Sequence, residues 1–84
     1  MNNGLEGWRK EINELDRQLI RTLEARFRVV EKIAGYKRTN GLPVRDEKRE
    51  QELLALLAED TSLSPQFLRD LYAVIFANSY LIEQ

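Results

Sequence analysis

Three basic residues lie inside or at the edge of an apolar stripe that the sequence pattern predicts. Between about residues 5 and 39, apolar residues recur every three or four positions, as they do on one face of an α-helix. Arg26 and Lys37 fall inside this apolar stripe, and Arg9 falls on its edge. An unpaired buried cation is costly, so we expect each buried cation of the stripe to have an anionic or hydrogen-bonding partner.

The stretch GLPVRDEKREQELL, residues 41–54, also turns charged residues inward. Asp46, Arg49 and Glu50 share the i, i+3, i+4, i+7 spacing of one helical face with Leu53 and Leu57. Because these leucines should face the core, the three charged side chains should face inward as well, nearer the helix start. A polar helix end at the rim of a helical bundle is the alternative interpretation.

Ser79 and Glu83 form a third polar pair, one helical turn apart and beside Tyr72 and Ile75. Taken alone, the pair is best explained as a solvated C-terminal turn. Taken with the polar residues of the two preceding segments, it predicts a pocket that receives polar groups from three helices.

The residue types in this pocket favour binding of a small polyanion. Arg26 and Lys37 are three helical turns apart, about 16 Å, so one carboxylate cannot serve both. An excess of inward-facing cations predicts a ligand that brings its own anions, most simply a dicarboxylate. The alternatives are an internal salt bridge of Arg26 or Lys37 with Asp46 or Glu50, and a cation that reaches solvent at the end of the stripe.

Histidine and cysteine are absent from the sequence, and this bounds the chemistry. Without them there is no common metal ligand set and no obvious nucleophile–base pair. We therefore expect no metal and no covalent catalysis. What remains is electrostatic stabilisation and orientation of one bound molecule.

The overall composition limits the partners and the compartment. The 84 residues suit one domain, residues 1–84, and 13 basic against 14 acidic residues leave a net charge of −1. A protein that binds nucleic acid without sequence specificity needs a basic surface, so nucleic acid is not expected. The longest apolar runs are too short to span a membrane, and the N-terminus lacks the apolar core of a signal peptide. We expect a cytoplasmic protein.

The apolar spacing predicts an all-α fold of three helices, at about residues 5–39, 46–59 and 64–83. Asn40 or Gly41 should end the first helix in a left-handed conformation, Asp46 should cap the second, and Ser64 should cap the third. A first helix of roughly 34 residues is about 50 Å long. A compact chain of this length is only about 30 Å across. We therefore predict an intertwined homodimer in which the overhanging stripe is buried by a second copy.

The combined motifs resemble those of the all-helical chorismate mutases. The similarity extends over WRKEINELDRQLIRTLEARFRVVEKIAGYK, then GLPVRDEKREQELL, then ANSYLIE in the last helix. The resemblance implies intertwined three-helix dimers with two active sites. It also implies the Claisen rearrangement of chorismate to prephenate, on the route to phenylalanine and tyrosine, without a cofactor or covalent intermediate.

The resemblance also implies a role for each basic residue of the pocket. Arg26 matches the arginine that grips a substrate carboxylate, and Arg9 matches the arginine that reaches into the other protomer's site. Lys37 matches the lysine that hydrogen-bonds the substrate ether oxygen, where negative charge grows as the C–O bond breaks. Arg49 and Ser79 match further polar positions near the carboxylates.

Three acidic residues complete the implied site. Glu50 matches the acid that accepts the substrate hydroxyl, and Asp46 lies beside it at the helix start. Glu83 departs from the better-known bacterial members, which have Gln at this position. A Gln amide donates a hydrogen bond at any pH, whereas a Glu carboxyl donates only when it is protonated.

Two other functions remain open at the level of sequence. An isochorismate pyruvate lyase on the same fold would have much the same pocket cations. A non-catalytic domain could bind chorismate or prephenate as a signal for an attached enzyme. The sequence does not distinguish a free domain from one fused to another enzyme of the pathway.

Overall fold

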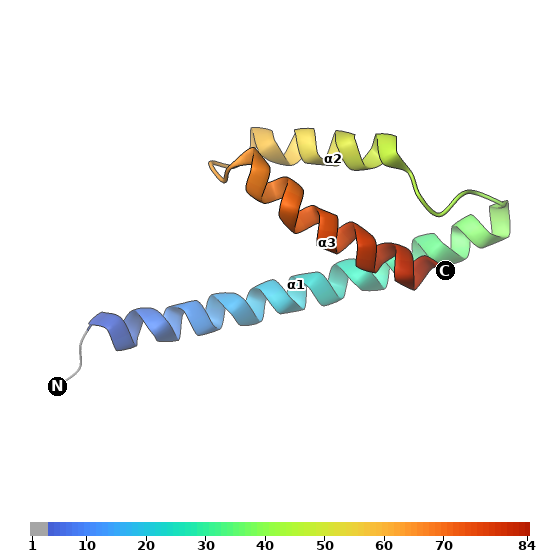
Figure 1. Cartoon of the computed structure of the whole chain (residues 1–84). Coiled ribbons are helices and arrows are strands. Elements are labelled where there is room, and N and C mark those ends of the chain that lie inside the picture. The colour runs from blue at the N-terminus through green and yellow to red at the C-terminus, as the bar shows by residue number, and fades with distance from the viewer. Residues whose placement is uncertain (1–3) are drawn as a thin grey trace.

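A computed structural model describes residues 4–84, and this part of the chain consists of three α-helices without a strand. They are α1 (Gly4–Asn40), α2 (Glu47–Glu59) and α3 (Pro65–Glu83), shown in Figure 1. The predicted all-α class is confirmed, and each helix boundary lies within one residue of the expected position.

Gly41 ends α1. It has a φ of 64°, in the left-handed region that glycine adopts without steric cost. The backbone N–H of Leu42 then donates to the carbonyl of Lys37 at 2.9 Å, which satisfies one of the last carbonyls of the helix. The sequence left Asn40 and Gly41 as alternatives, and the structure selects Gly41.

Side-chain caps set the starts of the two shorter helices. The Asp46 carboxylate accepts from the backbone N–H of Arg49 at 3.0 Å, and the Ser64 hydroxyl accepts from that of Phe67 at 2.9 Å. Pro65 occupies the first turn of α3, where its missing N–H does no harm. Both predicted caps are confirmed, and they fix where α2 and α3 leave the preceding loops.

Helix α3 holds the chain together, because it packs against both α1 and α2, whereas the backbones of α1 and α2 do not come close. Figure 1 shows α3 running from the far end of α2 to the second half of α1. The apolar core at these contacts is small. Its buried members are Val30, Ala34, Leu68 and Ile75.

The first half of α1 extends away from this core (Figure 1). The described chain measures 61 × 24 × 17 Å and has a radius of gyration of 16.7 Å, against about 12 Å for a compact chain of this length. The stripe on the extended half is open to solvent: Trp8 is 64% exposed and Leu15 60%. The expected overhang is therefore present, and the homodimer that would bury it stays a prediction.

No helix within residues 4–84 is both long enough and apolar enough to cross a membrane.

Candidate active site

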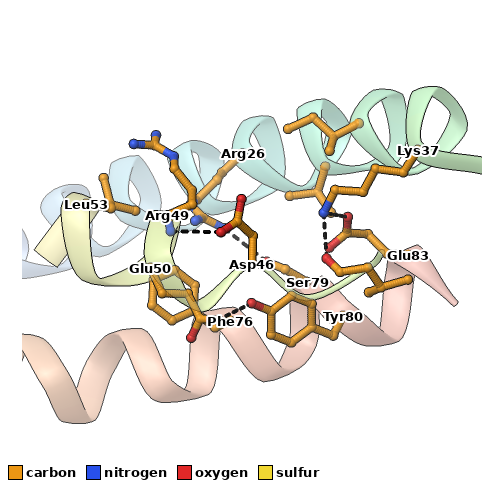
Figure 2. A pocket seen from close by; sticks show the side chains of 13 residues that line it. Arg26, Lys37, Asp46, Arg49, Glu50, Leu53, Phe76, Ser79, Tyr80 and Glu83 are labelled. Carbon is orange, nitrogen blue, oxygen red and sulfur yellow. Dashed lines mark hydrogen bonds and ion pairs between the residues drawn. The ribbon is translucent and has the colours of Figure 1, made fainter. Parts of the chain in front are cut away.

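A cavity of about 230 Å³ lies where the second half of α1, the start of α2 and the end of α3 approach one another. Figure 2 shows the side chains that surround it. Seven of the eight predicted site residues line this cavity, together with apolar side chains from the same elements. The lining consists of Arg26, Val30, Ile33, Lys37, Val44, Asp46, Arg49, Glu50, Leu53, Phe76, Ser79, Tyr80 and Glu83.

Arg26 is held in place by α3. Its guanidinium donates to the Ser79 hydroxyl at 3.0 Å and lies 5.9 Å from the ring centroids of both Tyr72 and Phe76. The Ser79 hydroxyl in turn donates to the carbonyl of Ile75 at 2.9 Å. No carboxylate within residues 4–84 pairs with Arg26, so its charge is oriented by neutral groups and remains available to an anion.

Lys37 has an internal partner, and it is not either of the two carboxylates considered from the sequence. Its ammonium lies 2.7 Å from the Glu83 carboxylate and also donates to the backbone carbonyl of Val44. Neither Asp46 nor Glu50 forms an ion pair with Lys37. Because Val44 precedes α2 and Glu83 ends α3, this single ammonium joins α1 to both other segments (Figure 2).

Glu83 and Ser79 are buried, so the solvated C-terminal turn considered from the sequence is wrong. The Glu83 side chain is only 5% exposed, and its Oε1 atom has no hydrogen-bond donor among the described residues other than the paired Lys37 ammonium. The carboxyl group therefore depends on Lys37 for its stabilisation.

The start of α2 supplies the third wall. Asp46 caps the helix through its side chain while also lining the cavity. The Arg49 guanidinium has no ion-pair or hydrogen-bond partner within residues 4–84 and is exposed in the single chain. The Glu50 carboxylate accepts from the Tyr80 hydroxyl and lies 3.4 Å from the guanidinium Nε of Arg45.

The count of charges corrects one expectation. The cavity wall carries three cations and three carboxylates, so it has no simple excess of positive charge. The unpaired positive charge is instead confined to two of the three cations. Glu83 is paired with Lys37, and Glu50 is contacted by Arg45 from outside the cavity, which leaves Arg26 and Arg49 without a carboxylate in the described chain.

Arg9 does not reach this cavity. It lies 17 residues before Arg26 on α1, about 26 Å along the helix axis, and is exposed in the single chain. It stands next to Trp8 on the open stripe. The predicted role of Arg9 in the site of another copy is compatible with this position and stays a prediction.

Sequence reasoning missed the aromatic side of the site. Phe76 lies against Arg26, and Tyr80 holds Glu50, yet neither was selected as a site residue. The available signal was their spacing, because Tyr72, Phe76 and Tyr80 follow one another at intervals of four on the face of α3 that carries Ser79. The apolar members of the wall carried no separate signal of function.

The described chain is all-helical, and its cavity carries two guanidinium groups without a carboxylate partner among residues 4–84. The chain belongs to the chorismate mutase type II family, whose model matches residues 8–84. The family suggested by the sequence motifs is thereby confirmed, and the name of this family is that of an isomerase activity.

Similar curated proteins come from three strains of Buchnera aphidicola, each named as a bifunctional chorismate mutase/prephenate dehydratase. The relative from Buchnera aphidicola subsp. Baizongia pistaciae is 36% identical over 87 residues, covering 100% of this chain and 24% of its own length. The relative from Buchnera aphidicola subsp. Schizaphis graminum is 32% identical, covering 98% of this chain and 22% of its own length. The chain thus spans about a quarter of the length of these relatives.

Proposed function

We propose that this chain catalyses the rearrangement of chorismate to prephenate, the step that leads toward phenylalanine and tyrosine. Family membership and the curated relatives support this reaction. The observation that carries the proposal is the pair of guanidinium groups, Arg26 on α1 and Arg49 on α2, which line the same cavity without a carboxylate partner in the described chain. Chorismate carries two carboxylates, and guanidinium groups bind carboxylates through two parallel hydrogen bonds.

The reaction is unimolecular: one C–O bond breaks and one C–C bond forms, with no atom gained or lost. The enzyme has to hold the flexible substrate in a compact conformation and stabilise the charge that develops. Arg26, oriented by Ser79 and two aromatic rings, is suited to fix one carboxylate. Such preorganisation matters because a cation fixed in a dry cavity acts more strongly than a mobile cation in water.

Lys37 is suited to the substrate ether oxygen, which becomes more negative as the C–O bond breaks. Within the described chain its charge is balanced by Glu83 at 2.7 Å. An ionised Glu83 would weaken the field of Lys37 and could not donate to the oxygen. A protonated Glu83 would release the full charge of Lys37 and supply a second donor. We therefore assign the active state to protonated Glu83.

Glu50 is suited to accept the hydroxyl of the substrate ring, with Asp46 beside it at the start of α2. The second carboxylate of the substrate then falls to Arg49 and to Arg9 of a second copy of the chain. The open apolar stripe on the first half of α1 supports this homodimer, because Leu5, Ile12 and Leu19 are each at least half exposed in the single chain. A cytoplasmic location stays a prediction from the sequence.

Identification of the product tests the proposal. The protein is mixed with chorismate and, separately, with isochorismate, and the products are followed by NMR. Prephenate from chorismate is the expected result. Pyruvate and salicylate from isochorismate would indicate a lyase instead, and tight binding without turnover would indicate a regulatory domain.

A further inference from the structure

Tyr80 connects the aromatic face of α3 to the charged start of α2. Its hydroxyl donates a hydrogen bond to Oε2 of Glu50, and Figure 2 shows the two side chains meeting at the edge of the cavity. The Nε atom of Arg45 lies 3.4 Å from the same oxygen, and the Arg45 guanidinium lies 5.9 Å from the centroid of the Tyr80 ring. Three side chains from the loop, α2 and α3 therefore form one contact group.

Both contacts to Glu50 fall on one oxygen. Oε2 receives the Tyr80 hydroxyl and the Arg45 guanidinium, whereas Oε1 has no hydrogen-bond or ion-pair partner within residues 4–84. The Glu50 side chain is 16% exposed and Arg45 is 62% exposed. Tyr80 is half-buried, so it is the more enclosed of the two groups that contact Oε2. Solvent weakens the contact of the exposed Arg45 with Glu50.

The Tyr80 hydroxyl stays protonated over the pH range in which enzymes usually work. Burial, and next the hydrogen bond to Glu50 and the charge of Glu50, raise the pKa of Tyr80 to about 12, although the Asp46 backbone and Arg45 act in the opposite direction. The hydroxyl is therefore a constant hydrogen-bond donor to Glu50.

We propose that Tyr80 is a positioning residue that holds Glu50 by Oε2, so that Oε1 stays directed to the hydroxyl of the bound ring. The inference rests on the proposed function, in which Glu50 accepts that hydroxyl, and it adds Tyr80 and, more weakly, Arg45 as the groups that orient it. The last torsion of a glutamate side chain is broad, so an unanchored carboxylate spreads over many orientations. Anchoring one oxygen makes the other a defined acceptor, and this favours ligands that carry a hydroxyl at that point.

The test compares two ligands on three chains. The ligands are chorismate and its analogue in which hydrogen replaces the ring hydroxyl. The chains are the parent, Tyr80→Phe, which keeps the ring and removes only the hydroxyl, and the control Tyr36→Phe. Tyr36 is 64% exposed on α1 and does not line the cavity. Both kcat/KM and the dissociation constant are measured, and circular dichroism confirms that each variant is folded.

We expect Tyr80→Phe to lower kcat/KM and binding for chorismate by about fivefold to twentyfold, less than the full loss of a hydrogen bond to a charged group, because Arg45 still contacts Oε2 of Glu50. The deoxy analogue should change by less than about twofold, because it makes no use of Glu50. In a Glu50→Ala background, Tyr80→Phe should have no further effect on chorismate. Tyr36→Phe should match the parent.

An equal loss for both ligands, no loss for either, or a loss that persists in the Glu50→Ala background would overturn the inference. If Tyr80→Phe does not fold, Arg45→Gln takes its place, with a smaller loss that must again be confined to chorismate. The proposed function fails separately. A parent chain that binds chorismate without converting it refutes the mutase, and the dissociation constants of the two ligands still decide the role of Tyr80.

Discussion

The ion pair between Lys37 and Glu83 matters both for the stability of the fold and for the proposed reaction. Within the fold it satisfies a buried carboxylate that has no other donor among the described residues. In the proposed reaction the same group must donate to the ether oxygen and stop neutralising Lys37. The fold therefore uses Glu83 as the partner of Lys37, and the proposed reaction uses it as a hydrogen-bond donor to the substrate.

The activity should depend on whether residue 83 can donate a hydrogen bond. Glu83→Gln should match or exceed the parent in kcat at neutral pH, because an amide donates without a proton from solution and carries no charge to neutralise Lys37. Glu83→Ala should be poorly active, because it removes the donor. Steady-state kinetics on chorismate give the three kcat values, and a Glu83→Gln chain no better than Glu83→Ala would contradict this assignment.

The two cations of the stripe should differ in their effect on stability. Lys37→Ala leaves the buried Glu83 carboxylate without its partner, which typically costs about 3–5 kcal/mol. Arg26→Ala leaves no unpaired carboxylate, and Ser79 keeps its bond to the Ile75 carbonyl, so the loss should be nearer about 1 kcal/mol. Both variants should lose turnover.

Chemical denaturation without ligand gives the two free energies of unfolding. The control is Lys37→Ala combined with Glu83→Gln, which removes the stranded charge and should recover part of the loss. Equal destabilisation by Lys37→Ala and Arg26→Ala would contradict the predicted cost of leaving Glu83 without its partner.

At the level of the helices, the sequence was informative where local chemistry decides the structure. Asp46, Ser64 and Gly41 each act within a few residues, so the boundaries of all three helices could be predicted from caps and turn residues. The inward direction of Arg26 and Lys37 also followed from spacing alone. These features depend on one helix at a time.

The partners of those residues could not be predicted, because they depend on how helices pack. Helical spacing predicts that Lys37 points inward. It does not predict that its ion-pair partner is Glu83 of α3 and neither Asp46 nor Glu50. The same holds for Tyr80, whose contact with Glu50 requires α2 and α3 to lie at one particular separation. Contacts between residues distant in sequence need the packing of α3 on both other helices.

At the scale of the molecule, the unpaired half of α1 predicts shared active sites. An Arg9→Ala chain and an Arg26→Ala chain should each be poorly active. When the two are mixed, each heterodimer should contain one site that has lost both arginines and one that has kept both. Activity should therefore return to about a quarter of the parent level at equal amounts, if half of the dimers are mixed.

Subunit exchange in the mixture is checked first, by mass spectrometry of intact dimers. The control is each variant mixed with itself, which should show no gain. Exchange without any recovery of activity would count against a role for Arg9 across the interface, and an active monomer in sedimentation equilibrium would refute the dimer itself.

The position of the Lys37 ammonium also has a consequence for how the chain opens. It bonds the Val44 carbonyl in the loop before α2 and the Glu83 carboxylate in the last turn of α3. When the Lys37 ammonium is released, both segments lose a contact. Their backbone amide hydrogens should therefore be replaced by deuterium at rates that change together. The amides of Leu42 and Gln84, bonded to the carbonyls of Lys37 and Tyr80, are suitable reporters. Lys37→Met should speed both together, whereas independent fraying of the two segments would leave their rates unrelated.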